Sequence, residues 1–313
     1  MMDYVKAYGA PVGSGRIKCC PEDFRVTELY DFEPSGNGEH LLLWIEKTGA
    51  NTGWVGNQLA AHFKLRHFDV SYCGKKDRHA VTGQWFSCWL PGVKEVDLAS
   101  IQIEGVTIQK QVWHHRKLRR GDHRGNRFVI EVRNLAVKDI AQLEERLLLL
   151  CGSGFPNYFG PQRFGINNQN LDKALELISD DEMQSRRKLD RKQKDIYLSA
   201  LRSWLFNQLL ATHVQRADWK DNGELWVYGL APHRDINIPA VTEPYQAAAA
   251  FIEKMGIKAH NRAKCVVPEQ MEWQLAEGQL TLSFDLPVGA YATTLLAEIL
   301  EIEDDQMKAV ELH

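Results

Sequence analysis

The stretch FDVSYCGKKDRHAVTGQWFSCWLPG, residues 68–92, has the pattern of two strands joined by a charged loop. Phe68, Val70 and Tyr72 alternate with polar residues, as in a short strand, and GQWFSCWLPG reads as the strand that returns. The loop between them carries one carboxylate, Asp77, among several cationic side chains. Loops at strand ends often hold functional residues, so this stretch predicts both a sheet and a candidate site.

Two further strands and a helix are expected upstream of this loop. PEDFRVTELYDF, residues 21–32, alternates apolar and polar side chains, and HLLLWIEKTG, residues 40–49, has a strand composition. The loop between them contains Pro, Ser, Gly and Asn, which predicts that the two strands form a hairpin. NTGWVGNQLAAHFKL, residues 51–65, predicts an amphipathic helix that starts at Asn51–Thr52.

Downstream, the chain passes between strand and helix patterns. NRFVIEVRN, residues 126–134, is strand-like, and residues 138–154 predict a helix that ends at a glycine. The middle, from about residue 155, is rich in helix pattern, and residues 280–300 return to a strand, a Pro-Gly break and a helix. The acidic EIEDD, residues 301–305, reads as a solvated helix face or tail. An insertion inside a parent domain of mixed strands and helices would produce this order.

Length and composition describe an ordinary globular protein. The chain has 313 residues, of which 44% are hydrophobic and 25% charged, and its net charge is -3. A nucleic-acid partner therefore has to be argued from local patches. The six cysteines form no CxxC pair and no Cys/His metal spacing, which favours free thiols in a reducing cytosol. Without a signal-peptide core or a run of about 20 apolar residues, we expect a soluble, cytoplasmic protein and no membrane association.

Two basic runs stand out against the acidic total. They are WHHRKLRRGDHRGNRF, residues 113–128, and RRKLDRKQK, residues 186–194. Cations in such runs can contact a phosphate backbone and release its counterions. Trp113 and Phe128 lie in the first run, and aromatic rings among cations suit a surface that stacks unpaired bases. A solvated face is the alternative for each run, and a core position is the alternative for each ring.

Asp77 has three open roles, as a nucleophile, a general base or an ordinary turn acid. Cations close to a carboxylate favour its ionised form, which argues against a proton donor. His79 can act as an acid or base, or it can be a structural or solvated loop histidine. Cys73 is a poor candidate for a nucleophile, because no partner base is indicated.

Two later motifs combine glycines or a helix pattern with polar side chains. PNYFGPQRFG, residues 156–165, places two Phe-Gly steps around Arg163, whose guanidinium can bind a phosphate or a buried carboxylate. A tight structural turn with a satisfied arginine is the alternative, and the G-x-G-x-x-G spacing of dinucleotide sites is missing. SALRSWLFNQ, residues 199–208, reads as a helix whose Arg202 and Asn207 lie off the core stripe, where solvent exposure is expected and contact with a ligand is the alternative.

Six segments follow one another along nearly the whole chain: KCCPEDFRVTE, CGKKDRHAVTGQW, RRGDHRGNRF, PNYFGPQRFG, SALRSWLFNQ and LPVGAYATTLL. In this order they resemble the motifs of the TruD family of tRNA pseudouridine synthases. The resemblance implies an α+β protein with the pseudouridine synthase fold, in which helices flank a mixed, largely antiparallel sheet. It also implies a catalytic domain of residues 1–154 plus 269–313 and an inserted α/β family-specific domain of residues 155–268. That insertion is shorter than the family form, which bears on how it grips tRNA.

The same resemblance implies that the chain isomerises a uridine of tRNA to pseudouridine, in the family the uridine at position 13, without a metal or organic cofactor. The base is expected to be flipped out of its stack before the reaction. Asp77 matches the family's essential aspartate, as a nucleophile or as an electrostatic partner of the sugar. Phe128 matches the aromatic residue that stacks on the target uracil. The expected substrate-binding residues are Phe128, Asn126, Lys18, Lys76, His79 and Arg163.

Two other functions stay open from the sequence. An RNA-binding or tRNA-folding module would use the basic runs but would not need Asp77, Phe128 and Asn126 together. A metal-dependent hydrolase acting on nucleotides would need a cluster of metal ligands, which the sequence lacks. The expected partner is tRNA, and the family habit implies a monomer that requires no protein partner.

Overall fold

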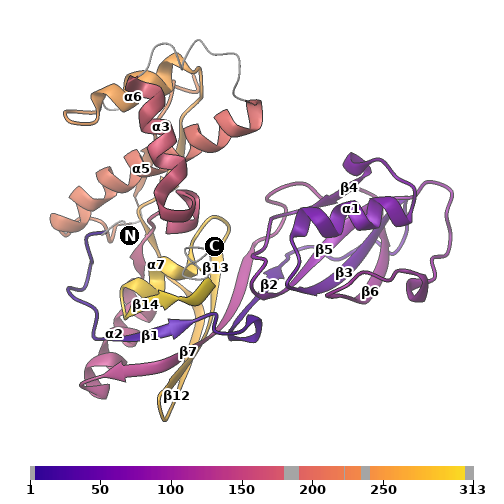
Figure 1. Ribbon diagram of the computed structural model, residues 1–313, viewed down its shortest axis with the longest axis horizontal. Helices are drawn as coiled ribbons and strands as arrows, with labels where there is room; N and C mark the ends of the chain where they lie inside the picture. Colours follow the sequence, from indigo (N-terminus) through magenta and orange to yellow (C-terminus); the bar gives the residue numbers. More distant parts are fainter. Residues whose placement is uncertain (1–3, 180–189, 222, 234–239, 307–313) are drawn as a thin grey trace. The chain divides into compact units, whose positions relative to one another are not determined.

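The structure, a computed structural model, describes residues 4–179, 190–221, 223–233 and 240–306. Contacts within the chain separate it into two compact units, and each unit draws on segments that are distant in sequence. They are called here the helical unit and the sheet unit after their main elements (Figure 1). The helical unit comprises Met1–Val12, Asp139–Val267 and Ala290–Leu300, and the sheet unit comprises Gly13–Lys138, Pro268–Gly289 and Glu301–His313.

The sheet unit is named for a ten-stranded sheet. Its strands are β1 (Gly13–Ile17), β2 (Phe24–Leu29), β3 (His40–Thr48), β4 (Val70–Tyr72), β5 (Val81–Trp89), β6 (Val106–His114), β7 (Gly125–Val137), β12 (Glu269–Ala276), β13 (Gln279–Pro287) and β14 (Glu301–Asp304). The order is β12-β13-β7-β2-β5-β3-β6, with β1 beside β7 and β14, and β4 beside β5. Only the β1–β14 and β2–β5 pairs in this sheet are parallel. A mixed, largely antiparallel sheet is therefore present, as expected.

The hairpin expected between residues 21–32 and 40–49 is wrong. Strands form at both places, but β5 lies between β2 and β3 and pairs with both of them. The reason is burial: β5 is buried along most of its length, so it is stabilised best in the centre of the sheet with a neighbour on each side. The loop between β2 and β3 is not a tight two-residue turn, so it does not force these strands together.

Helix α1 (Thr52–His62) packs on β4 and β5 and follows Asn51, as expected (Figure 1). Val55 and Leu59 are fully buried in a cluster with residues of β3 and β5. The strand expected to contain Phe68 starts only at Val70, so that part of the prediction is wrong. A 3₁₀ turn precedes β4, closed by a bond from Asp69 N to the Arg66 carbonyl at 2.9 Å, and it leaves Phe68 49% exposed.

Residues 301–304 of the acidic segment form a strand, so the expected helix face or tail is wrong there. Its strand, β14, pairs in parallel with β1. Cations of the β1 segment explain this pairing, because Arg16 donates to the Asp305 carboxylate at 2.7 Å and Lys18 Nζ lies 3.2 Å from Asp304 Oδ2. Asp304 and Asp305 are therefore paired with cations in β1 or next to it.

One face of the sheet collects several residues of interest. Phe24 and Val26 of β2 are buried, and the register places Val26 opposite Phe128 of β7. Glu28 and Asn126, which lie two residues away from Val26 and Phe128 on their strands, are also opposite each other. Because residues two apart on a strand share a face, all five side chains point to the same side of the sheet.

The helical unit is organised around its longest helix, α5 (Figure 1). Its helices are α2 (Ile140–Ser153), α3 (Gln169–Ser179), α5 (Arg191–Gln215), α6 (Gln246–Lys254) and α7 (Ala292–Ala297), and its strands are β8 (Phe155–Pro156), β9 (Glu224–Val227), β10 (His260–Ala263) and β11 (Cys265–Val266). Leu201, Leu205 and Leu210 of α5 are fully buried, and α3, α6 and β9 pack against this helix. The helix-rich middle expected from the sequence is confirmed.

The expectation that Arg202 and Asn207 face solvent is wrong. Asn207 is 1% exposed, and its amide group accepts a bond from Phe159 N at 2.8 Å and donates one to the Phe159 carbonyl at 3.0 Å. Arg202 donates to the carbonyl of Tyr228 at 2.6 Å. Buried backbone groups outside regular ladders need such partners, so both side chains stabilise irregular backbone.

Candidate active site

Asp77 lies in the loop between β4 and β5, where three groups fix its position. Its Oδ2 accepts a hydrogen bond from Lys18 Nζ at 2.7 Å, and its Oδ1 accepts one from the backbone N–H of His79 at 3.1 Å. Its backbone carbonyl accepts a bond from Lys47 Nζ at 2.9 Å. The side chain is still 29% exposed, so a ligand can reach the carboxylate.

Lys18 reaches Asp77 from the end of β1. Its backbone has a φ of 57°, a left-handed conformation that residues other than glycine rarely adopt. Its side chain is 4% exposed, and Nζ lies 3.2 Å from Asp304 Oδ2 and 4.8 Å from the ring centre of Phe24. Strained backbone that holds a buried cation is typical of functional sites.

The pair of Lys18 and Asp77 is charged. Burial favours the neutral form of Asp77, but the Lys18 ammonium and the His79 N–H outweigh burial and lower the pKa of the carboxyl. Burial also opposes the charge on Lys18, yet Asp77 and Asp304 raise the pKa of this ammonium. The site therefore holds one ammonium between two carboxylates at neutral pH.

The cations within the loop itself do not hold the Asp77 carboxylate. Lys76 Nζ contacts Glu28 in an ion pair whose side chains are 6% and 0% exposed. Arg78 Nε donates to the carbonyl of Gly49 at 3.1 Å. The ionised carboxylate expected from the sequence is present, but its main cationic partner comes from the end of β1.

The contact between Lys76 and Glu28 closes the base of the loop. Burial raises the pKa of Glu28 and lowers the pKa of Lys76, although each partner opposes the shift of the other. The Tyr30 hydroxyl also donates to Glu28, and the backbone N–H of Lys76 donates to the Thr52 hydroxyl at 2.9 Å. In this structure the Lys76 ammonium is paired with Glu28, so its expected contact with substrate stays a prediction.

Phe128 and Asn126 lie on the sheet face that contains Phe24. The ring of Phe128 is stacked on Phe284 at 5.6 Å and meets Phe24 edge-on at 6.1 Å, and the residue is 8% exposed. Asn126 Oδ1 is buried and has no hydrogen-bond partner among the described residues. A buried acceptor of this kind is rare in folded proteins and points to a donor that a ligand supplies.

His79 and Cys73 flank Asp77 in the same loop. His79 contributes its backbone N–H, and its side chain also helps to lower the pKa of Asp77. Cys73 is 2% exposed, and burial raises its pKa to about 11. A thiol held protonated in this way fits the expectation that Cys73 is not a nucleophile.

Arg163 belongs to the helical unit, whereas the other expected site residues belong to the sheet unit. Its Nε donates to the Tyr291 hydroxyl and its Nη1 to the Ser199 hydroxyl, both at 3.1 Å. Its guanidinium also lies 5.3 Å from the ring centre of Phe159. These partners suit the structural alternative for this arginine, and a contact with substrate stays a prediction.

The first basic run, residues 113–128, is divided between exposed and buried positions. Arg119 and Arg120 are exposed in the loop between β6 and β7, whereas His114 and His123 are buried. The second run, residues 186–194, falls mostly outside the described residues. The evident candidate for an exposed cationic surface is therefore the β6–β7 loop.

Three charged residues of the site were not identified as functional groups from the sequence: Lys47, Glu28 and Asp304. Lys47 is fully buried, and burial lowers its pKa to about 8 although Asp77 opposes the shift. Period-two alternation places Lys47 with the inward residues of β3 and Glu28 with those of β2. A charge at an inward strand position is the signal that could have found both.

The part of the chain that the structure describes contains neither a cluster of metal ligands nor a helix that could cross a membrane. No group of three or more His, Cys, Asp and Glu side chains there could hold a metal ion. Among the same residues, no helix combines the length and apolar character needed to cross a membrane.

Comparisons with known proteins agree with one another. The family model described as tRNA pseudouridine synthase D (TruD) matches residues 4–178. A protein of Hydrogenovibrio crunogenus named tRNA pseudouridine synthase D is 36% identical over 336 residues, covering 95% of this chain and 96% of the relative. Proteins of the same name from Cellvibrio japonicus and Marinobacter nauticus are 37% and 38% identical, covering 98% and 97% of this chain and 95% and 96% of the relatives.

A solved structure extends the comparison to the fold. The crystal structure of a protein assigned as tRNA pseudouridine synthase D from Methanosarcina mazei matches this chain with a TM-score of 0.63. The match covers 97% of each chain at 18% sequence identity, so it concerns the fold alone. The α+β fold expected from the sequence is confirmed.

Proposed function

We propose that Asp77 is the catalytic carboxylate of this chain, which belongs to the tRNA pseudouridine synthase D family and is an isomerase that converts uridine to pseudouridine in tRNA. The reaction breaks the bond from ribose to N1 of uracil, turns the base and joins ribose to C5. The observation that carries the proposal is the ionised, partly exposed carboxylate of Asp77, which accepts bonds at both oxygens.

An ionised Asp77 can serve each of the available routes. It can attack ribose C1′ or uracil C6 as a nucleophile, stabilise positive charge that develops on the ribose, or assist removal of a proton from C5. Each route uses the anion, which Lys18 maintains because its ammonium lowers the pKa of the carboxyl against the effect of burial. Proton donation by Asp77 is disfavoured for the same reason.

The uracil is proposed to bind between Asp77 and the sheet face of β2 and β7. Phe128 supplies an aromatic ring for stacking, and the unpartnered Oδ1 of Asn126 can accept the N3–H of uracil. Lys18 connects the two parts, because it contacts both Asp77 and the ring of Phe24. To enter, the base has to leave its stack, which costs a few kcal/mol.

The finer features of the substrate and of the protein belong to the same proposal. The target is the uridine at position 13, and phosphate groups of the tRNA contact the first basic run, residues 113–128. Residues 155–268 form a family-specific insertion in a catalytic domain of residues 1–154 plus 269–313. The protein acts in the cytoplasm as a monomer, without a protein partner.

The experiment that tests the proposal compares wild-type protein with Asp77→Asn on unmodified tRNA, with pseudouridine mapped by position. We expect product at one uridine with wild type, also in excess chelator, and a loss of turnover on the order of 10⁴-fold or more in the variant. Affinity for tRNA should stay within about twofold, because the substitution removes one charge and keeps the shape. Asp31→Asn, at a side chain that is 70% exposed, is the matched control and should keep full activity.

Each failure of this experiment has a distinct meaning. If a folded wild-type protein binds tRNA and forms no product, the chain acts as an RNA-binding module. If Asp77→Asn retains turnover close to wild type, another group carries the reaction. If the chelator abolishes activity, a metal takes part and the role of Asp77 has to be assigned again.

A further inference from the structure

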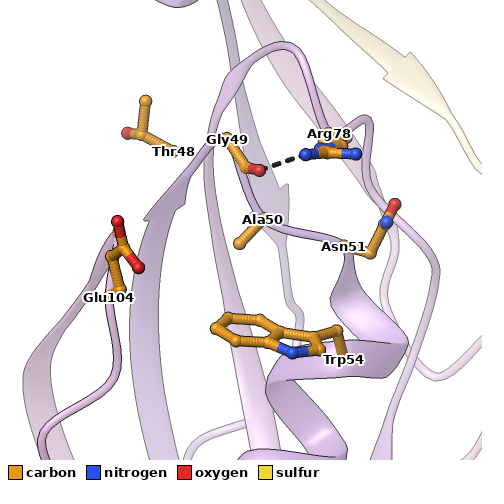
Figure 2. A pocket seen from close by; sticks show the side chains of 8 residues that line it. Thr48, Gly49, Ala50, Asn51, Trp54, Arg78 and Glu104 are labelled. Carbon is orange, nitrogen blue, oxygen red and sulfur yellow. Dashed lines mark hydrogen bonds between the residues drawn. The ribbon is translucent and has the colours of Figure 1, made fainter.

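A pocket of about 470 Å³ opens beside the Asp77 loop in the sheet unit (Figure 2). This volume falls in the range of about 300–1,000 Å³ that small-ligand sites occupy. Trp54, Arg78 and Glu104 provide its aromatic and charged groups, and backbone of the β3–α1 loop completes it. None of these side chains has a role in the reaction proposed above.

The pocket is joined to the candidate active site by direct chain connections. Arg78 follows Asp77, and Thr48 follows Lys47, whose ammonium holds the Asp77 carbonyl. Consecutive Cα atoms are 3.8 Å apart, so an occupant of the pocket lies next to the loop that carries the carboxylate. The lining of the pocket is therefore continuous along the chain with the Asp77 loop.

The chemistry of the lining suits a nucleobase. The indole of Trp54 extends across the bottom of the view in Figure 2, with Glu104 on one side and Arg78 on the other. Trp54 is 41% exposed, so a face of its ring is available to a ligand in the pocket. A flat ring stacks on a base, a carboxylate accepts from an amino group, and a guanidinium contacts a phosphate.

The rim of the pocket is held in place by backbone geometry. Gly49 and Gly105 have φ of 70° and 69°, conformations that favour glycine. Thr48 N donates to the Gly105 carbonyl at 2.8 Å, and a Cβ on Gly105 would meet the Thr48 carbonyl oxygen at 2.5 Å. The two loops that form the rim are thus clamped together, as in a preformed binding site.

We propose that this pocket binds an unpaired nucleotide of the tRNA next to the target uridine, with its base stacked on Trp54 and its amino group donating to Glu104. The proposal rests on the function proposed above. It predicts a preference for adenine, cytosine or guanine over uracil at that position, because uracil has no amino group. Arg78, which uses Nε for the Gly49 carbonyl, keeps its terminal nitrogens for a phosphate of the same strand.

The first test measures tRNA binding and turnover separately for Trp54→Ala. Dissociation constants are measured in an Asp77→Asn background, so that they do not depend on catalysis. Loss of one stacking partner should raise the dissociation constant and KM by about 5- to 150-fold. The single-turnover rate constant at saturation should stay within about threefold. Trp54→Phe should restore most of the affinity, and thermal melting checks that each variant is folded.

The matched control is Phe68→Ala, which removes another exposed aromatic ring of the sheet unit that is not part of the pocket lining. It should leave the dissociation constant within about twofold of its parent. An unchanged affinity in Trp54→Ala, or an equal loss in Phe68→Ala, overturns the proposal. If wild type forms no pseudouridine but Trp54→Ala still weakens tRNA binding, only the catalytic proposal fails.

The second test asks whether Glu104 reads the base. A set of RNA substrates replaces each nucleotide that flanks the target with uracil, one at a time. Wild type should show a KM penalty of about tenfold at one flanking position, and Glu104→Gln should reduce this penalty to about twofold or less. A wild-type enzyme that is indifferent to every flanking base, or a penalty that survives in Glu104→Gln, overturns the assignment of Glu104.

Discussion

Two lysine–carboxylate pairs meet at the Asp77 loop, and they differ in burial and in the direction of their pKa shifts. Lys76 and Glu28 are 6% and 0% exposed, and burial lowers the pKa of the lysine and raises the pKa of the glutamate. In the pair of Lys18 and Asp77, burial acts in the same way but is outweighed, so the pKa of the lysine is raised and that of the aspartate is lowered. We call them the closed pair and the open pair.

The difference follows from what else each pair contacts. Lys18 is shared with a second carboxylate, Asp304, and Asp77 accepts a further bond from a backbone N–H and stays 29% exposed. The side chains of the closed pair are 6% and 0% exposed, so they have almost no contact with water. A closed pair thus holds backbone in place, while an open pair keeps an ionised carboxylate available to a ligand.

Removing half of the closed pair is expected to have the largest effect on stability. Lys76→Met leaves Glu28 buried without its cation, which should lower the free energy of unfolding by about 3–5 kcal/mol. Adding Glu28→Gln to this variant should recover part of the loss, because it removes the unpaired charge. Urea unfolding followed by tryptophan fluorescence measures both variants.

The neighbouring lysine gives a matched control for the closed pair. Lys75→Met changes an exposed residue of the same loop and should alter the free energy of unfolding by no more than about 0.5 kcal/mol. If Lys76→Met is as stable as Lys75→Met, the closed pair does not hold the loop, and its burial has another cause.

Removing the cation of the open pair should affect activity more than stability. In Lys18→Met the Asp77 carboxyl loses the ammonium that lowers its pKa, so at neutral pH a smaller fraction is ionised. We expect kcat/KM to fall by about 10²–10³-fold at pH 7 and to recover partly as the pH rises, because the acid limb of the profile moves to higher pH. The pH dependence of kcat/KM measures this shift.

Arg16→Met is the control for this prediction, since Arg16 is a cation of β1 that pairs with its own acid, Asp305. Its acid limb should match that of wild type. A Lys18→Met enzyme whose acid limb has not moved would show that the ammonium does not set the charge of Asp77.

The two pairs also bear on how much of the structure could be predicted from the sequence. Strand and helix positions such as β2, β5, α1 and α2 follow from local alternation and periodicity, and these expectations held. Pairing order did not, because β5 enters between β2 and β3 through burial that no local pattern encodes. Segment 301–305 was misjudged for the same reason, since it becomes a strand only by pairing with β1.

The candidate site could be predicted from the sequence to a similar extent. Asp77 was singled out as a candidate because its own loop is distinctive, and its ionised state was expected from charge. The cation responsible, Lys18, is 59 positions away in sequence, and only the resemblance pointed to it. Lys47 was overlooked because it stands in an apolar strand, where a single lysine is easily taken for an outward-facing residue.

Lys47 carries a pH-dependent prediction of intermediate size. Burial lowers its pKa to about 8, below the value of about 10.4 expected in the unfolded chain. Between these values the unfolded state binds more protons, so the free energy of unfolding rises with pH, by about 1 kcal/mol from pH 7 to pH 9. Lys47→Met should lack this rise, which urea unfolding at several pH values measures relative to wild type.

The prediction is tested on the difference in the free energy of unfolding between wild type and Lys47→Met, because other groups titrate in both proteins. A difference that does not change from pH 7 to pH 9 would mean that the Lys47 ammonium is as accessible to solvent as an ordinary lysine. The contrast between closed and open charges would then not extend to this residue.

The smallest effect on function is expected from a single exposed arginine that contacts tRNA. Arg120 is exposed in the β6–β7 loop, whereas Arg127 donates to both oxygens of Asp285, at 2.7 and 2.9 Å. If Arg120 contacts one phosphate, Arg120→Gln should lower the slope of log affinity against log salt by about 0.7–0.9. Filter binding of tRNA at several salt concentrations, in the Asp77→Asn background, gives these slopes.

Arg127→Gln is the matched variant, and it should leave the salt slope unchanged while lowering the free energy of unfolding by about 1–3 kcal/mol. The reason is that Asp285, whose side chain is 3% exposed, would lose both bonds from Arg127 and keep the more distant Arg124, at 3.9 Å. An equal change of slope in both variants would mean that an internally paired arginine also reaches the phosphates. Pairing with a buried acid would then fail to separate the cations that bind tRNA from those that hold the sheet together, since the Arg127 side chain is itself 42% exposed, and the comparison would be confined to Asp77.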